Sequence, residues 1–160
     1  MKLTKLSMMA GLMLALSNSS FAEGIDAPYP EGYRSWFHVK TMLIEPGHQL
    51  QNPFQGIHHV YANPKAVEGL GTGTYTDGSV FVFDLLHYVE KDLTIQEGDR
   101  KLTGIMHKDS KKYSSTGGWG FEGFAEDSKT KRLVNDGGKS CFACHTSERE
   151  TDFVFSQIRK

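Results

Sequence analysis

The sequence SVFVFDLLHYV, residues 79–89, follows a turn at Asp77-Gly78 and sets the architecture of the chain. Valine and phenylalanine favour extended backbone, so these residues predict a strand. Successive side chains of a strand point to opposite faces. One face then carries Phe81, Phe83, Leu85 and His87, and the other carries Val80, Val82, Asp84 and Leu86. Since both faces are mostly apolar, we expect a central strand that is covered on both sides.

Short strands and turns account for most of the remaining chain. We expect strands at residues 57–61, 100–108, 119–125 and 152–158, and a helical turn at residues 33–36 that leads into a strand. Asn63-Pro64 is typical of a helix start, because asparagine caps the helix and proline suits its first position. A short helix is therefore predicted over residues 64–70. Together these elements indicate a mainly β (α+β) fold.

Both cysteines of the chain lie in the motif Cys141-Phe142-Ala143-Cys144-His145, which is the signature of c-type haem attachment. Two thiols at this spacing add to the two vinyl groups of a haem, and the histidine that follows becomes an axial ligand of the iron. We therefore predict one covalent haem c, attached through Cys141 and Cys144, with His145 as the metal ligand.

Three other roles for this motif are less well supported by the sequence. A thioredoxin-like dithiol belongs near the start of a βαβ unit, and no such unit precedes Cys141. A zinc site needs four ligands, so distant histidines would have to replace the missing second cysteine pair. A disulfide between cysteines three positions apart would be strained. Haem attachment remains the favoured interpretation of the motif.

The first 22 residues are typical of a secretory signal peptide. Lys2 and Lys5 precede an apolar run at residues 8–16, and the small residues Ser20 and Ala22 suit a signal peptidase. The run is shorter than the roughly 20 residues that span a bilayer, so we expect no membrane contact after cleavage. Because haem is attached to such motifs outside the cytoplasmic membrane, the predicted location is a bacterial periplasm.

Residues 23–160 have the size of one ordinary domain, and we expect them to form a single haem domain. Loss of Lys2 and Lys5 from the 18 basic residues leaves 16 against 19 acidic ones, a formal charge of −3. This charge does not favour binding to a polyanion, so no nucleic-acid partner is expected.

Several motifs occur in the same order as in a known family. They are Tyr33-Arg34-Ser35-Trp36, Val60-Tyr61-Ala62-Asn63-Pro64, Asp77-Gly78-Ser79-Val80, Lys108-Asp109-Ser110-Lys111, the cysteine motif, and Thr151-Asp152-Phe153-Val154-Phe155. In this ordered set the chain resembles the cytochrome P-460 family, over nearly the whole of residues 23–160. The resemblance implies an antiparallel β-sheet with a few short helices around one haem, usually in a homodimer.

Two branches of this family differ at the position that matches Phe83. The hydroxylamine-oxidising members have a lysine there that cross-links to the haem, and phenylalanine cannot form that bond. Lys91 is eight residues further along, roughly 26 Å of extended strand. The chain therefore resembles the cytochromes c′-β, whose distal haem face is lined by phenylalanine and whose iron is typically five-coordinate. We predict that Phe83 and Phe54 form this distal cap, with ordinary core packing as the alternative for both.

His58 matches a position at which the cross-linked relatives have a distal arginine, so we predict a polar distal role for it. A surface or structural role is the alternative. The sixth iron position has other candidate ligands in the mature chain: His38, His48, His59, His87, His107, Met42 and Met106. His87 shares a face with Phe83 but lies about 13 Å along the strand, so we expect it beyond the haem edge.

The charged residues give weaker signals. Candidates to pair with the haem propionates are Arg34, Arg100, Lys108 and Lys111, and candidates to act as a base are Asp109 and Glu122. Solvated surface charge is the alternative for each.

Three functions are compatible with these observations. An apolar distal side excludes water and offers no hydrogen bond to a bound ligand, which favours a protein that binds NO or a similar diatomic for scavenging or sensing. The cross-linked relatives imply instead an oxidoreductase that acts on hydroxylamine or peroxide. The third function is electron transfer to a redox partner protein, which requires a strong sixth ligand.

Overall fold

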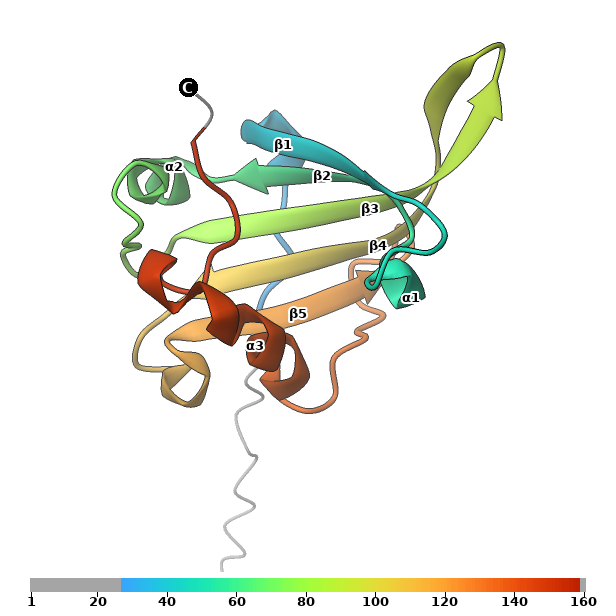
Figure 1. Ribbon diagram of the computed structural model, residues 1–160. Coiled ribbons are helices and arrows are strands. Elements are labelled where there is room, and N and C mark those ends of the chain that lie inside the picture. Colours follow the sequence, from blue (N-terminus) through green and yellow to red (C-terminus); the bar gives the residue numbers. More distant parts are fainter. Residues whose placement is uncertain (1–26, 159–160) are drawn as a thin grey trace, which may run out of the picture.

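Residues 27–158, which are those the structure describes, fold around a single antiparallel sheet of five strands that follow chain order. In this computed structural model the strands are β1 (Phe37–Ile44), β2 (Gly56–Ala62), β3 (Val80–Lys91), β4 (Thr94–Lys108) and β5 (Trp119–Ala125) (Figure 1). The mainly β fold is confirmed, and the strand predicted at residues 79–89 is the central strand β3. The predicted signal peptide, residues 1–22, lies outside the described residues.

The helices of the described chain are short. They are α1 (Gln51–Phe54), α2 (Pro64–Leu70) and α3 (Lys139–His145), with 3₁₀ turns η1 (Tyr33–Ser35), η2 (Ser114–Thr116) and η3 (Thr146–Thr151). Helix α2 has the predicted bounds, since the Asn63 side chain accepts hydrogen bonds from the backbone N–H groups of Ala66 (2.9 Å) and Val80 (3.0 Å). Between residues 27 and 158 no helix is long and apolar enough to cross a membrane.

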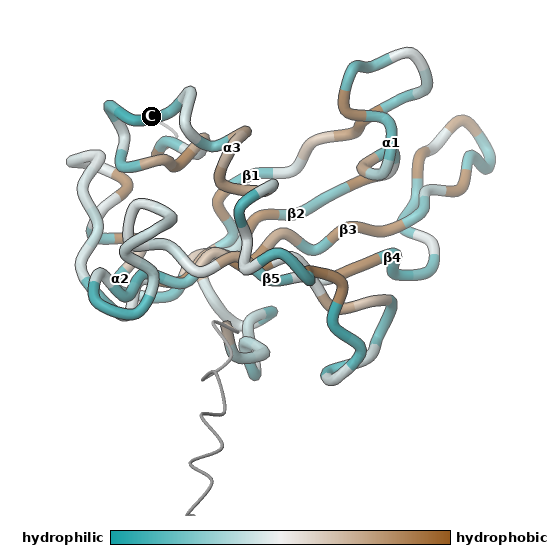
Figure 2. Tube along the Cα trace, turned by 90° about the horizontal axis from the view of Figure 1, so that it is seen from below, coloured by the Kyte–Doolittle hydropathy of each residue, from teal (hydrophilic) through white to brown (hydrophobic). Residues whose placement is uncertain are grey.

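Strand β3 is covered on both faces, as its composition predicts. On one face a hydrophobic cluster joins Phe81 and Phe83 to Met106, Phe121 and the α3 residues Cys141 and Phe142. On the other face Ile105 and Phe124 pack with the chain that precedes β1. In Figure 1, α3 and the chain that follows it cross the front of the sheet, while the segment before β1 passes behind it. Figure 2 shows hydrophobic residues along the strands and mainly polar ones in the loops.

The structure corrects three details of the secondary structure. Strand β4 begins at Thr94, six residues earlier than predicted, so β3 and β4 extend into a hairpin that projects beyond the rest of the sheet (Figure 1). Phe54, for which no helix was predicted, ends helix α1. Residues 152–158 do not form a strand, because Asp152 (φ 50°) and Phe153 (φ 67°) have left-handed backbone.

Candidate functional site

The cysteine motif lies on α3, which packs against β5. The helix begins after Gly138 (φ 81°), and the Asp136 carboxylate accepts hydrogen bonds from the backbone N–H groups of Gly138 and Ser140, both at 2.9 Å. A Cβ atom on Gly138 would lie 3.0 Å from the Phe121 Cβ atom. Glycine at this position therefore allows the start of α3 to approach β5 closely.

The two cysteines have different surroundings. Cys141 is half-buried against the hydrophobic cluster, and Cys144 is exposed. Both are free thiols. They are three residues apart on a helix, so they lie on neighbouring positions of one helix face. Burial raises the pKa of the Cys141 thiol above its ordinary value. Both groups are therefore available as thiols, and neither is consumed by a disulfide.

His145 is held by a single well-defined hydrogen bond. Its Nδ1 atom lies 2.7 Å from the backbone oxygen of Phe153, and because a carbonyl can only accept, Nδ1 must carry the proton. The lone pair of Nε2 is then free. Burial lowers the pKa of His145, which keeps the ring neutral, although the bond to Phe153 opposes this shift. Metal-bound histidines typically have this arrangement, with one nitrogen donating to a carbonyl and the other on the metal.

Aromatic rings surround His145, and the sequence did not identify them as part of the site. The ring centroids of Phe121 and Phe155 each lie 4.9 Å from that of His145. Phe153 packs edge-on against Phe142 of α3 at 5.0 Å. The alternation of Trp119, Phe121 and Gly123 along β5 was a usable signal for Phe121. Phe153 and Phe155 also alternate, but their backbone does not form a strand, so this alternation did not indicate which rings face His145.

The three predicted distal residues come together. The Phe83 ring lies 5.8 Å from that of Phe54 and 4.4 Å from that of His58. Phe83 packs against the same hydrophobic cluster as Cys141 and Phe142, so the trio lies on the α3 side of the sheet. His58 is on β2, diagonally opposite Phe83, because Val60 is the cross-strand partner of Phe83 and Leu85 that of His58.

His58 is a buried imidazole with an unused nitrogen. Only 4% of the residue is exposed, and its Nδ1 atom has no hydrogen-bond partner among the described residues. Burial lowers its pKa to about 4, and the charges of Lys40 and His59 contribute. The ring is therefore neutral at physiological pH and available to donate or accept one hydrogen bond.

Several of the other candidates are engaged elsewhere. Arg34 and Arg100 bind Asp84, and Lys108 binds Asp152, so these three are not free for propionates. Glu122, a candidate base, is buried, which contradicts the alternative of a solvated surface charge, and it accepts a hydrogen bond from Arg132 at 2.8 Å. His87 is exposed where β-bulges interrupt the alternation of β3.

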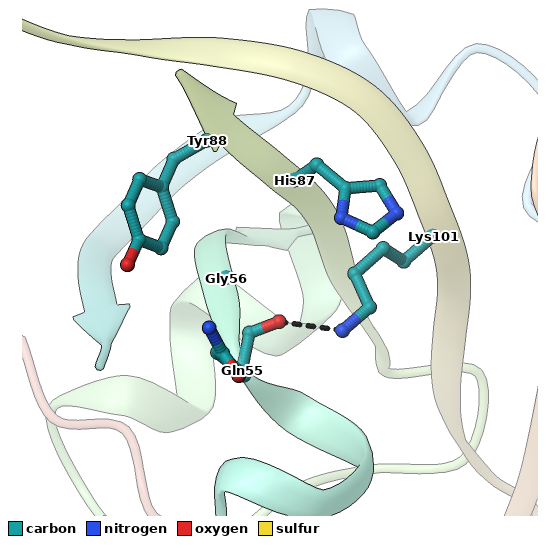
Figure 3. A pocket seen from close by; sticks show the side chains of 5 residues that line it. All are labelled: Gln55, Gly56, His87, Tyr88 and Lys101. Carbon is teal, nitrogen blue, oxygen red and sulfur yellow. Dashed lines mark hydrogen bonds between the residues drawn. The ribbon is translucent and has the colours of Figure 1, made fainter. Parts of the chain in front are cut away.

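A separate cavity of about 410 Å³ opens near α1, lined by Gln55, Gly56, His87, Tyr88 and Lys101 (Figure 3). Its lining is largely polar, and the Lys101 ammonium donates to the backbone oxygens of Gln55 (2.6 Å) and Pro53 (3.1 Å). His87, a candidate for the sixth iron position, lines it, but Cys141, Cys144 and His145 do not. We therefore assign it to the anchoring of α1 on β4 and not to the candidate site.

The donor set fits a haem. A neutral imidazole offers Nε2, two thiols share its helix, and the surrounding face of the sheet is rich in phenylalanine.

A search of curated proteins found no match to the chain, but a comparison with protein-family models supports a haem site. The family model described as Cytochrome P460 matches residues 30–156, which include every strand and helix of the structure. The chain therefore belongs to the cytochrome P460 family, and it is a haem-binding cytochrome.

Proposed function

We propose that this cytochrome carries one covalent haem c, attached through Cys141 and Cys144 with His145 as the proximal ligand, and that it binds NO on the opposite side. The observation that carries the proposal is the Nδ1 bond of His145 to the Phe153 oxygen at 2.7 Å, which leaves Nε2 as a metal donor beside two free thiols.

Attachment needs only the groups present in the motif and the haem vinyl groups. Each thiol adds its S–H bond across one vinyl group, so that a C–S bond forms and the proton goes to the neighbouring carbon. The addition is redox-neutral and requires no oxidant. Cys141 is half-buried and Cys144 is exposed, so the thiol of Cys141 lies nearer the sheet.

Phe54, Phe83 and His58 are proposed to form the distal side, as in the c′-β branch. Their rings pack together, and the two phenylalanines exclude water and offer no hydrogen bond. With His145 as a ligand, a bound haem would supply an iron that can take a diatomic ligand. Because Phe83 occupies the position of the cross-linking lysine and cannot form that bond, we favour this branch over the hydroxylamine-oxidising one.

The first test is a titration of the holoprotein with NO, after expression with a c-type haem maturation system. We expect haem to stay with the chain on a denaturing gel, and the ferrous absorption spectrum to shift on addition of micromolar NO. The matched control is Cys141→Ser/Cys144→Ser, which should lose haem under denaturation. Haem that is released from the unaltered chain would refute covalent attachment, and a spectrum indifferent to NO would refute the open site.

Replacing Phe83 with alanine should increase ligand affinity. In this proposal an incoming ligand displaces the Phe83 ring from Phe54 and His58, and each of these two contacts contributes about 0.7 kcal/mol. Removing the ring should tighten NO binding about tenfold, which corresponds to about 1.4 kcal/mol. Stopped-flow measurement of NO association and dissociation checks this. Phe37→Ala, at an exposed position on β1, is the control that should bind NO as before. Unchanged affinity of Phe83→Ala would remove Phe83 from the distal cap.

One observation favours a second candidate function. The buried, unpartnered Nδ1 atom of His58 is suited to exchange a proton with a bound substrate, as an oxidoreductase acting on hydroxylamine or peroxide would require. The test is turnover with an artificial electron acceptor. A rate no better than that of free haem would eliminate this candidate.

Location and assembly are part of the proposal. Residues 1–22 support export to a periplasm, and the family resemblance supports a homodimer. Fractionation of a bacterial host and sedimentation of the mature protein test these two statements independently.

A further inference from the structure

A buried ion pair fastens the chain after α3 to the end of the sheet. Lys108 is the last residue of β4 and only 8% exposed. Its Nζ atom lies 2.7 Å and 2.8 Å from the two carboxylate oxygens of Asp152, and it also donates to the Gly117 carbonyl oxygen at 3.2 Å. Both oxygens of one carboxylate thus accept from the same ammonium group.

Strand β5 binds the backbone of Asp152. Trp119 is the first residue of β5 and the cross-strand partner of Lys108, and it is fully buried. Its indole Nε1–H donates to the Asp152 carbonyl oxygen at 2.9 Å. The Tyr75 backbone N–H donates to the Asp152 carboxylate at 3.3 Å. Side chain and main chain of Asp152 are therefore both fixed by the sheet and its connections.

These contacts hold a turn that the chain would not adopt readily by itself. Asp152 (φ 50°) and Phe153 (φ 67°) are consecutive non-glycine residues in the left-handed region. Aspartate tolerates this conformation, but for phenylalanine it is a genuine outlier. Such backbone persists only where surrounding contacts over-determine it, and it is frequent at functional sites.

The strained turn ends at the group that orients His145. The Phe153 backbone N–H donates to the backbone oxygen of Glu148 at 2.7 Å. The Phe153 backbone oxygen accepts from His145 Nδ1, also at 2.7 Å. A relaxation of the Asp152–Phe153 backbone would rotate this oxygen away from the imidazole. The direction of the Phe153 carbonyl thus depends on Asp152, and Asp152 depends on Lys108.

We propose that Lys108 and Asp152 are positioning residues for His145. They hold the Phe153 carbonyl oxygen in the place where it fixes the proton on His145 Nδ1 and strengthens Nε2 as an iron donor. The inference rests on the proposed function in one respect, namely that His145 ligates the haem iron. A second-shell acceptor of this kind orients a ligating histidine and raises its basicity.

The test uses the holoprotein with Lys108→Met, Asp152→Asn and the double substitution. Asparagine keeps the shape of aspartate and tolerates the left-handed backbone, so Asp152→Asn should fold even if Lys108→Met does not. The readouts are the iron–histidine stretching band of the ferrous protein by resonance Raman spectroscopy and the reduction potential. We expect the band to broaden and shift to lower frequency and the potential to rise. The double variant should resemble the single ones, because each single substitution already breaks the same Lys108–Asp152 ion pair.

Arg132→Met is the matched control, since it breaks another pair with a buried carboxylate, Arg132–Glu122, on the opposite face of the sheet. It should lower the melting temperature without moving the iron–histidine band. An unmoved band in Asp152→Asn, or an equal shift in Arg132→Met, would overturn the positioning role. Absence of the band from the unaltered holoprotein would instead show that His145 is not the ligand, and the proposed function itself would fail.

Discussion

Replacing His145 with alanine is expected to leave haem attached to the chain but to change the coordination and spin state of the iron. The thiols of Cys141 and Cys144 make the covalent bonds, and neither thiol depends on the imidazole. The substitution removes Nε2, which the bond from Nδ1 to Phe153 leaves free for a metal. Ferric and ferrous absorption spectra, with magnetic circular dichroism, measure the change.

The smaller substitution His145→Gly allows a chemical rescue. Added imidazole should enter the space between Phe121 and Phe155, whose ring centroids both lie 4.9 Å from that of His145, and restore the original spectrum. His59→Ala is the control histidine, because His59 pairs with Glu97 (2.7 Å) and lies on the opposite face of β2 from His58. If His145→Ala retained the spectrum of the unaltered protein, the proximal assignment would be wrong.

Strands and helices whose residues carry a clear local sequence pattern were predicted correctly. Strand β3 was identified from its Val and Phe content, and α2 from the Asn63-Pro64 start. Alternation along β3 placed Phe83 and Asp84 on opposite faces, which the structure confirms. The meeting of Phe54 with Phe83 depends on the position of α1 over the sheet, and it was anticipated only through the family resemblance.

Other features depend on contacts that no local pattern contains. Residues 152–158 have the alternating phenylalanines of a strand, but Lys108 and Trp119 bind Asp152 in a left-handed turn. The residues that extend β4 at its start are polar and exposed, so they lack the burial pattern by which a strand is identified. Arg34 and Arg100 were named as candidates to pair with propionates because the sequence does not reveal that both side chains reach Asp84.

Replacing Asp84 with asparagine should destabilise the fold by about 3 kcal/mol, because breaking a buried ion pair leaves its partners without a counter-charge. The Asp84 side chain is completely buried. One carboxylate oxygen accepts from Arg34 Nε (3.1 Å) and Nη2 (2.9 Å), and the other accepts from Arg100 Nε (2.7 Å). For a chain of this size the expected fall in melting temperature is about 10 °C, measurable by circular dichroism. Glu31→Gln, which breaks the exposed pair with Lys129, should leave the melting temperature nearly unchanged.

The pH dependence of this effect separates the charge of Asp84 from its shape. Burial by itself would raise the pKa of Asp84, but hydrogen bonds and charge from Arg100, with the hydrogen bonds from Arg34, lower the pKa below its ordinary value. A carboxylate whose pKa is lower in the folded state stabilises the fold at pH values above its unfolded pKa, about 3.9, and loses this contribution as the pH falls towards the folded pKa. The difference in stability between the unaltered protein and Asp84→Asn should therefore be largest near neutral pH and shrink below about pH 4. A difference that stayed constant down to pH 3 would mean that Asp84 acts through packing and not through its charge.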